Sequence, residues 1–413
     1  MKKTFKDIDV ANKRVFVRVD FNVPQDENGN ITDDTRIRAA LTTIKYLVKQ
    51  NAKVILCSHL GRPKGVVNEK YSLRPVAERL SELLDMPVKM AEDVVGESAK
   101  KLTSEMQDGE IVLLENVRFH AEEEKNDDDF ARQLASLADI FVNDAFGTAH
   151  RAHASTAGIA KYLPAVAGFL MDSEVVALTN ATQNAEKPLV VILGGAKVSD
   201  KIGVIKALMT KANTILIGGA MAYTFFAAKG YEVGFSKYEP DKIDMAKEIM
   251  EKAEEMNVKL VLPVDEVCGL EFAENAKSKT FASDQIGKDW QGLDIGKKTR
   301  KLFANEISKA KTIIWNGPMG VFEFKKFNKG TLAVATAVAK SGALSIIGGG
   351  DSVAAINLLG FGDKVSHLST GGGATLEFLE GKNLPGVAML LDKEEKVSTP
   401  DFAAMDQKTI DKF

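Results

Sequence analysis

Short apolar segments that end in polar or glycine-rich turns alternate with helical patterns along the whole chain. In the first half these segments cover residues 14–19, 53–57, 88–91, 111–114 and 140–143. In the second half they cover residues 189–193, 214–217, 259–262, 311–315 and 344–347. Each is short enough to form a strand that is buried on both faces. The alternation predicts an α/β fold of mostly parallel sheets with helices on both faces.

The length of the chain favours two such units. A chain of 413 residues is long for a single hydrophobic core. Residues 172–186 have a helical pattern with few breakers, between a glycine-bearing segment and Pro188. We therefore expect two Rossmann-like domains joined by a hinge helix at 172–186. The expected limits are 1–171 for the N-terminal domain and 187–379 for the C-terminal domain, followed by a segment at 380–413.

The composition excludes several classes of protein. Apolar residues make up 45% and charged residues 27% of the chain, as in ordinary globular proteins. A net charge of −3 gives no electrostatic reason to expect nucleic acid or a membrane as a partner. The N-terminus lacks the apolar core of a signal peptide, and no run approaches the ~20 apolar residues of a membrane span. Cys57 and Cys268 form no metal-ligand spacing and no disulfide framework, so we expect a reducing cytoplasm.

Arginine is concentrated in the first part of the chain. Ten of the eleven arginines lie at or before Arg151, and only Arg300 lies beyond it. Arginine is preferred where a carboxylate or a phosphate is held by two hydrogen bonds. The turns after the predicted strands carry Asp20 and Asn22, His59 and Arg62, Arg118, and His150 and Arg151. The carboxyl ends of parallel strands share one edge, so these residues predict a basic pocket for a small, multiply charged anion; drift in arginine usage is the alternative.

Glycine-rich turns end four segments of the second half, at residues 194–195, 218–219, 348–350 and 371–373. Together they would form a groove of backbone N–H groups, as a nucleotide requires. The first turn leads to Lys197 and Lys201 at the start of a helical pattern. Taken alone, that turn fits a phosphate site and an ordinary βα turn equally well. A dinucleotide coenzyme is disfavoured, because no G-x-G-x-x-G follows the first strand of either half.

A basic pocket on one domain and a nucleotide groove on the other suit transfer of a phosphoryl group to a small anion. Such a reaction depends mainly on positioning the reactants and neutralising their charge. It needs no nucleophilic side chain, and the sequence has no evident Ser/His/Asp or Cys/His arrangement.

Eight longer motifs resemble those of the phosphoglycerate kinase family. They are RVDFNVP (18–24), SHLGRP (58–63), LENVRF (114–119), NDAFGTAHRAHAS (143–155), LGGAKVSDK (193–201), WNGPMGVFE (315–323), GGGDS (348–352) and STGGGATLEFLEGK (369–382). They cover nearly the whole chain in the family's order. The resemblance implies a monomeric glycolytic enzyme that uses Mg²⁺ and moves a phosphoryl group between 1,3-bisphosphoglycerate and ADP, giving 3-phosphoglycerate and ATP. It also implies in-line transfer after hinge closure.

The resemblance assigns roles to individual residues. The 3-phosphoglycerate site would comprise Asp20, Phe21, Asn22, Arg36, His59, Leu60, Gly61, Arg62, Arg118 and Arg151. Arg36 would lie nearest the reacting carboxyl group, Lys197 would reach the transferred phosphoryl group, and Gly372 and Gly373 would present N–H groups to it. The nucleotide would be bound by Gly195, Lys201, Gly218, Gly219, Gly292, Asn316, Glu323, Gly349, Gly350, Asp351 and Ser352. Glu323 would bind the ribose and Asp351 would hold the magnesium.

Structural roles are the alternatives at several of these positions. Asp20 and Asn316 could be turn formers, and Glu323 a carboxylate at a helix start. His59 and His150 could be packed turn histidines. We expect the other three histidines, His120, His153 and His367, to be structural or exposed.

The C-terminal segment departs from the family. By resemblance, residues 380–391 would return to the N-terminal domain. The chain then continues beyond Leu391 for about twenty residues, many of them charged, which could be disordered, pack on the surface or reach a partner.

An inactive nucleotide-binding regulator is the alternative function. That alternative requires a lost catalytic position, whereas Arg36, Lys197 and Asp351 are all present.

Overall fold

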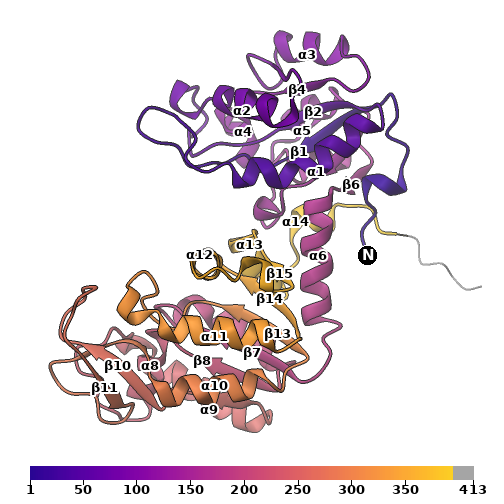
Figure 1. Ribbon diagram of the computed structural model, residues 1–413. Helices are drawn as coiled ribbons and strands as arrows, with labels where there is room; N and C mark the ends of the chain where they lie inside the picture. Colours follow the sequence, from indigo (N-terminus) through magenta and orange to yellow (C-terminus); the bar gives the residue numbers. More distant parts are fainter. Residues whose placement is uncertain (394–413) are drawn as a thin grey trace, which may run out of the picture.

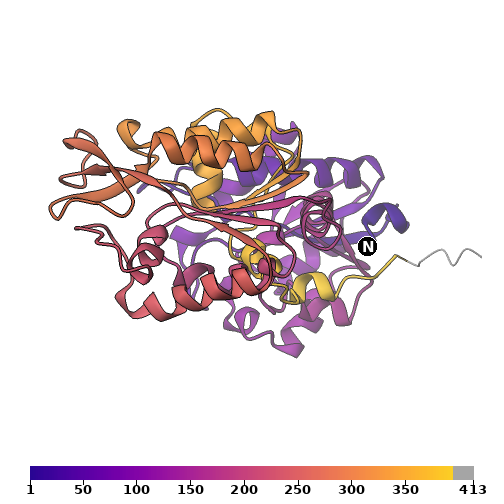
Figure 2. The ribbon, with the colours of Figure 1, turned by 90° about the horizontal axis from the view of Figure 1, so that it is seen from below.

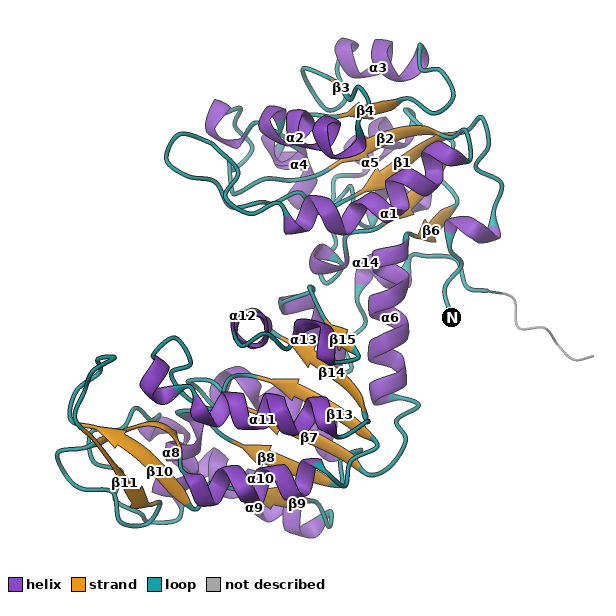
Figure 3. Cartoon of the chain, viewed as in Figure 1, coloured by secondary structure: helices purple, strands orange, loops and turns teal. Residues whose placement is uncertain are grey.

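The computed structural model describes residues 1–393. Two parallel sheets lie on either side of a connecting helix, α6 (Phe169–Thr182), as Figure 1 shows. Helices cover both faces of each sheet (Figures 2 and 3). The predicted α/β class with two mostly parallel sheets is confirmed. The predicted tail lies almost wholly in residues 394–413, outside the described residues.

The N-terminal sheet has the strand order β3-β4-β2-β1-β5-β6, and every neighbouring pair is parallel. Its strands are β1 (Arg14–Arg18), β2 (Lys53–Cys57), β3 (Lys89–Met90), β4 (Ile111–Leu113), β5 (Ile140–Asn143) and β6 (Ala165–Ala167). Its helices are α1 (Thr35–Lys49), α2 (Arg74–Leu84), α3 (Glu97–Ser104), α4 (Ala121–Glu124) and α5 (Asp128–Ala135). The strand order reverses between β1 and β5, which lie side by side, so the turns that follow these two strands diverge around a crevice.

The C-terminal sheet has the strand order β15-β14-β13-β7-β8-β9, and every neighbouring pair is parallel. Its strand order reverses between β7 and β13, which lie side by side. Its strands are β7 (Leu189–Leu193), β8 (Thr214–Ile217), β9 (Lys259–Val261), β13 (Thr312–Asn316), β14 (Leu344–Gly348) and β15 (His367–Leu368). Its helices are α7 (Ile202–Met209), α8 (Met221–Ala228), α9 (Ile243–Glu255), α10 (Lys297–Ile307), α11 (Lys329–Lys340), α12 (Gly350–Leu358) and α13 (Gly373–Leu379), while α14 (Pro385–Ala388) belongs to the C-terminal segment described below. Ligands bind at such reversal points in doubly wound sheets.

A small antiparallel sheet was not predicted. It consists of β10 (Asp265–Gly269), β11 (Ser278–Ala282) and β12 (Gln291–Ile295), in the order β11-β10-β12. These strands carry many charged and polar residues, and β11 is half exposed, so they lack the continuous apolar run of the central strands. The sheet projects beside α8 in Figure 3 and supplies one wall of a cavity described below.

The connecting helix begins at Phe169 and ends at Thr182, three and four residues earlier than the predicted 172–186. The start is fixed by a residue distant in sequence. Asp144, which follows β5, accepts hydrogen bonds from the backbone N–H groups of Leu170 and Met171 at 2.9 and 3.3 Å. A cap that comes from another segment leaves no local signal at the helix start.

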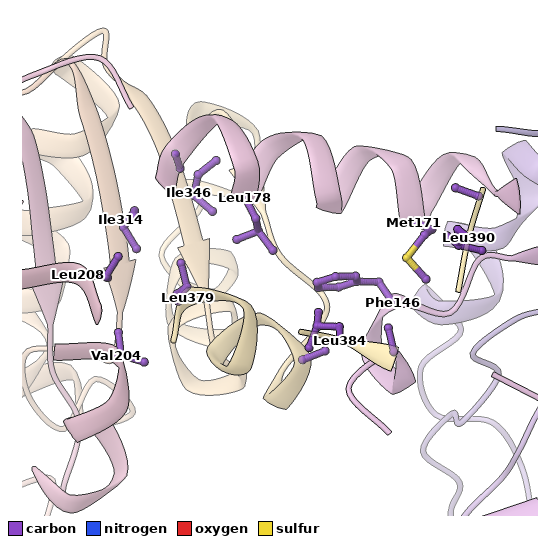
Figure 4. Close-up of a cluster of buried hydrophobic side chains, with 14 of the residues drawn as sticks. Phe146, Met171, Leu178, Val204, Leu208, Ile314, Ile346, Leu379, Leu384 and Leu390 are labelled. Atoms are coloured by element: carbon purple, nitrogen blue, oxygen red, sulfur yellow. The ribbon is translucent and has the colours of Figure 1, made fainter. Parts of the chain in front are cut away.

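One hydrophobic cluster is continuous between the two sheets (Figure 4). Phe146 and Met171 contribute from the N-terminal side, and Ile346 and Leu379 from the C-terminal side. Leu178 on α6 lies between them. The two halves therefore meet through buried apolar contact near α6 and not through a free linker.

The C-terminal segment lies against the N-terminal sheet. The N–H of Gly386 donates to the carbonyl oxygen of Ala149 at 2.8 Å, and that of Leu391 to Ala165 at 2.9 Å. The N–H of Lys3 in turn donates to Leu391 at 2.7 Å. These contacts place residues 386–391 beside the N-terminal sheet, while the domain limits stay a prediction.

Candidate active site

The first cavity, here called the N-terminal cavity, lies at the reversal point of the N-terminal sheet and has a volume of about 330 Å³. Most of the predicted substrate residues line it. They are Asp20, Asn22, Arg36, His59, Gly61, Arg62, Arg118 and Arg151. Phe21 and Leu60, also predicted, do not line it and are buried. Gly372 and Gly373 reach it from the C-terminal half.

The turn after β1 is locked by its own polar side chains. Asp20 Oδ1 accepts a hydrogen bond from the Asn22 N–H at 3.1 Å, and Asn22 Oδ1 accepts one from the Gly61 N–H at 2.8 Å. The second carboxylate oxygen of Asp20 pairs with Arg36 Nη1 at 2.6 Å. Asp20 is thus a turn former that also orients a predicted catalytic arginine. Arg62, Arg118 and Arg151 also line the cavity, and their positive charge is available to an anion.

A buried network supports His59 from behind. Arg18 is fully buried, and its Nη2 lies 3.1 Å from His59 Nδ1 while its Nε donates to Ser155 Oγ at 2.7 Å. Ser155 Oγ in turn donates to the buried carboxylate of Glu123 at 2.6 Å. Because arginine is only a donor, it fixes His59 Nδ1 as an acceptor and leaves the proton on Nε2. Burial, together with repulsion from Arg18 and Arg118, holds the pKa of His59 well below its usual value.

Sequence reasoning missed this network. Arg18 is the last residue of an apolar strand, and Glu123 stands in a run of charged residues, a pattern typical of a solvent-exposed segment. The unusual signal was an arginine at a position where a strand of a parallel sheet is buried. Such a charge must be paired, but the sequence does not show with what.

Arg118 and His150 also line the N-terminal cavity, whose arginines form a basic wall. Arg118 is 5% exposed and donates from Nη1 to the Gly61 carbonyl oxygen at 3.0 Å. Burial lowers its pKa, so the cavity holds a desolvated cation that an anion would neutralise. His150 lies beside Arg151, with 3.4 Å between His150 Nε2 and Arg151 Nε, and burial followed by that charge lowers its pKa. His150 therefore lines the cavity as a neutral residue.

His153, expected to be structural or exposed, is buried behind the same wall. Burial, and then Arg118, Arg18 and Arg151, lower its pKa from 6.5 to about 4. The unfolded chain binds a proton at His153 more readily than the folded chain, so stability is lost as the pH falls from 6.5 toward 4. We expect this loss to reach about 2 kcal/mol at pH 5. Urea unfolding of the wild type and of His153→Asn at pH 7 and pH 5 measures it.

The wild type should lose more of its free energy of unfolding between these two pH values than the His153→Asn variant, by about that amount. His59 acts in the same direction but is present in both proteins, so it cancels in the comparison. Equal losses in the two proteins would contradict a neutral His153.

The second cavity, here called the C-terminal cavity, lies at the reversal point of the C-terminal sheet and has a volume of about 350 Å³. Five predicted nucleotide-binding residues line it, namely Gly195, Gly219, Gly292, Glu323 and Asp351. Apolar and aromatic side chains that the sequence did not single out form the rest of the wall, among them Tyr223, Phe272, Leu293, Met319 and Phe322. An apolar slot with glycine backbone on one side and carboxylates near its mouth suits a nucleoside.

Close backbone contacts explain two of the glycines. Gly195 has φ +98° and Gly219 has φ +67°, a region that side chains rarely adopt. A Cβ on Gly219 would lie 2.5 Å from the Gly195 nitrogen. The turns after β7 and β8 therefore pack backbone against backbone, a contact that the sequence analysis did not predict. Gly218, by contrast, lies outside the cavity and faces Met319.

Several predicted phosphate-side residues form a second group next to the cavity. Asn316 at the end of β13 accepts from Lys201 Nζ and donates to the Gly348 carbonyl oxygen at 2.8 Å. Ser352 is buried and accepts from the Gly317 N–H at 2.6 Å, so it orders the turn after β13. Burial lowers the pKa of Lys201, while Asp200 and Asp351 counteract this shift. Gly349 and Gly350 stand at the start of α12 beside this group.

Lys197 is exposed and lines neither cavity. A role for Lys197 in the reaction therefore requires a change in the relative position of the two halves. Asp351 is also exposed, at the first turn of α12. It is a single carboxylate, and among residues 1–393 no three or more His, Cys, Asp or Glu residues are grouped as metal ligands.

The loop at 369–373 extends from the C-terminal half to the N-terminal cavity. Gly371 lies against the Phe146 ring, so close that a Cβ on it would overlap the ring. Thr370 is tied to the connecting helix, where Glu174 accepts from its N–H at 2.7 Å and from its hydroxyl at 3.0 Å. Glu174 also pairs with His367 at 2.8 Å. His367, expected to be structural or exposed, is thus part of the contact between the halves.

Comparison with known proteins decides the family. The model of the family described as phosphoglycerate kinase matches residues 5–382. This chain belongs to the phosphoglycerate kinase family. The phosphoglycerate kinase of Clostridium tetani is 57% identical over 395 residues, which are 95% of this chain and 98% of that protein. That of Pelotomaculum thermopropionicum is 56% identical over 392 residues, 95% of this chain and 100% of that protein.

Solved phosphoglycerate kinases have the same fold. The structure from Coxiella burnetii matches with a TM-score of 0.88 and 44% identity, and covers 94% of this chain and 98% of that one. The structure from Pyrococcus horikoshii matches with a TM-score of 0.81 and 36% identity over the same shares. The similarity extends over both sheets, so the two-domain architecture of this chain is that of phosphoglycerate kinases.

Membership in the phosphoglycerate kinase family makes the chain a kinase, with a nucleotide and a phosphoglycerate as its substrates. The interpretation as a nicotinamide coenzyme protein is excluded by this membership. No comparison supports the inactive regulator. Within residues 1–393, no helix has the length and apolar character needed to cross a membrane.

Proposed function

We propose that the chain catalyses the reversible transfer of a phosphoryl group between 1,3-bisphosphoglycerate and ADP, giving 3-phosphoglycerate and ATP, as a step of glycolysis. One observation carries this proposal. The N-terminal cavity combines a basic wall, which includes Arg36 and Arg118, with the backbone of Gly372 and Gly373 from the nucleotide half. A small anion bound there would face the domain that binds the nucleotide.

The acceptor we propose is the carboxyl group of 3-phosphoglycerate. A carboxylate attacks without losing a proton, so no general base is needed. This agrees with the state of the histidines, since His59 and His150 have lowered pKa values and are neutral near pH 7. Arg36 and Lys197 would screen charge on the phosphoryl oxygens from the two sides of the cleft, and Lys201 would hold the phosphates of the nucleotide.

Mg²⁺ fits the nucleotide side. Asp351 offers one exposed carboxylate at the mouth of the C-terminal cavity, and magnesium commonly takes one or two carboxylates together with substrate phosphates and water. When bound there, the ion would neutralise phosphate charge. Glu323, an exposed carboxylate that also lines this cavity, would accept hydrogen bonds from ribose hydroxyl groups.

In-line transfer after closure of the two domains completes the proposal. Lys197 is exposed and outside both cavities, so the halves must approach before it can reach a phosphoryl group. Closure would also exclude the water that hydrolyses an acyl phosphate. The connecting helix α6 is the natural hinge, because Glu174 on it holds the loop that carries Gly372 and Gly373.

Replacing Glu174 with leucine should uncouple that loop from the hinge. The substitution removes the acceptor of the Thr370 N–H and hydroxyl and the partner of His367. We expect kcat to fall about tenfold, because a small displacement of positioning groups is costly. The KM for ATP should change by less than about twofold, because Glu174 lies outside the C-terminal cavity. Steady-state kinetics measure both quantities, and a change confined to the KM for ATP would contradict the hinge role.

A coupled assay for ATP-dependent phosphorylation of 3-phosphoglycerate tests the function itself. We expect turnover that requires Mg²⁺ and that is abolished by chelation. Nucleotide binding without turnover at saturating concentrations of both substrates would overturn the proposal in favour of a regulator.

We also propose that the protein acts as a monomer in the cytoplasm, where its two cysteines, both buried free thiols, would stay reduced.

A further inference from the structure

A buried glutamate stands behind the C-terminal cavity, outside every role assigned above. Glu266 on β10 is 2% exposed. No lysine, arginine or histidine of residues 1–393 lies within ion-pair distance of it, and its charged neighbours are Asp294 and Asp265. Burial raises the pKa of Glu266 well above its usual value, and the hydrogen bond from Tyr223 counteracts this shift. A carboxyl group kept in such a place needs a hydrogen-bond partner.

The partner is a residue that lines the cavity. The Tyr223 hydroxyl donates to Glu266 Oε2 at 3.0 Å. Tyr223 lies on α8, directly after the glycine turn at 218–219, and its ring is 2% exposed while forming part of the cavity wall. The hydrogen bond therefore joins α8 to the small antiparallel sheet (Figure 1).

The same hydroxyl is pressed against another wall of the cavity. A Cβ on Gly292 would overlap the hydroxyl and ring of Tyr223, so the backbone of β12 packs directly on that ring. The N–H of Gly292 is held by Ser236 Oγ at 2.9 Å. The position of the Tyr223 ring thus sets the position of the Gly292 side of the cavity.

We propose that Glu266 is a positioning residue for the nucleotide base. By binding the Tyr223 hydroxyl it keeps the ring seated against Gly292 and keeps the hydroxyl out of the space that the base occupies. This inference rests on the proposed function, because it takes the C-terminal cavity to be the nucleotide site.

Loss of the acceptor has a specific consequence at this site. A buried hydroxyl without a partner is unfavourable, so it turns toward the nearest water. For Tyr223 the nearest solvent is the cavity that it lines. Glu266→Leu should therefore bring the hydroxyl into the cavity, where it competes with the base.

We expect Glu266→Leu to raise the Kd for ADP, measured by calorimetry, about tenfold. The KM for 3-phosphoglycerate and kcat at saturating substrates should stay within about twofold, since that substrate binds in the other domain. Glu266→Gln should retain ADP binding within about twofold, because its amide oxygen accepts the same hydrogen bond. Adding Tyr223→Phe to Glu266→Leu should restore most of the affinity, because no hydroxyl is left to turn.

Tyr162→Phe is the matched control. Its hydroxyl also donates to a carboxylate, Asp128 Oδ2 at 2.6 Å, but on the surface of the N-terminal domain. It should leave the Kd for ADP unchanged. If Glu266→Leu does not fold, Glu266→Asp replaces it, because the shorter side chain withdraws the acceptor, and Tyr223→Phe should rescue it in the same way.

Three results would overturn the proposal: wild-type affinity for ADP in Glu266→Leu, no rescue by Tyr223→Phe, or a loss confined to the thermal midpoint. The last result would mean that the pair has only a structural role. Failure of the proposed function is a separate result, because it would appear as a wild-type protein that does not phosphorylate 3-phosphoglycerate.

Discussion

Replacing Arg36 with methionine should lower kcat by a factor of about 10² to 10³, the usual cost of removing one group that stabilises transition-state charge. Arg36 is exposed on α1, yet its guanidinium is fixed by Asp20 at 2.6 Å and lines the N-terminal cavity. Methionine keeps much of the side-chain volume and removes the charge. The coupled assay at saturating substrates measures the effect.

Arg38→Met is the matched control for this prediction. Arg38 lies one half-turn along the same helix, is also exposed, and also pairs with a carboxylate, Asp34 Oδ1 at 2.8 Å. It does not line the cavity, so we expect its kcat within about twofold of the wild type. Equal losses in the two variants would show that net charge on α1, and not the position of Arg36, determines the rate.

Replacing Lys197 with alanine should also lower kcat by about 10² or more, while the Kd for ADP changes less than about threefold. The reason is its position, since Lys197 is exposed and outside the C-terminal cavity in this arrangement of the halves. It can contribute only after closure, when charge develops on the phosphoryl group. Kinetics combined with calorimetry separate the two quantities.

Lys206→Ala on α7 is the control, because Lys206 is an exposed lysine nine residues further along the same segment. We expect it to leave both quantities unchanged. A loss of ADP affinity in Lys197→Ala as large as its loss of kcat would refute a role confined to the transition state.

Strands and turns could be predicted from the sequence where their structure depends on neighbouring residues alone. Central strands such as β7 are buried on both faces and must be apolar, so their positions were predicted to within a residue. Turns at strand ends could be grouped, because parallel strands bring their ends together. The seven residues grouped in this way all line one cavity, namely Asp20, Asn22, His59, Arg62, Arg118, His150 and Arg151. The glycine turns at 194–195 and 218–219 were recognised because each directly follows an apolar segment, as a turn at the end of a buried strand does.

The parts that could not be predicted depend on partners distant in sequence. Asp144 fixes the start of α6 from another segment, and Glu123 compensates Arg18 through Ser155. The polar strands β10 to β12 have no apolar run, although β12 forms part of the wall of the C-terminal cavity. Resemblance to a family assigned roles to residues but did not reveal Tyr223 and Glu266, because a pair of this kind is recognised only from its geometry.

The contacts of Leu391 and Gly386 have a consequence for synthesis on the ribosome. The N-terminal sheet is hydrogen-bonded to residues that are translated more than two hundred positions later, such as Gly386, whose carbonyl oxygen accepts from Asn143 at 3.2 Å. The N-terminal half therefore emerges first but cannot make these contacts until the C-terminal half has left the exit tunnel. We expect the N-terminal half to complete its native contacts only after residues 386–391 have emerged from the ribosome.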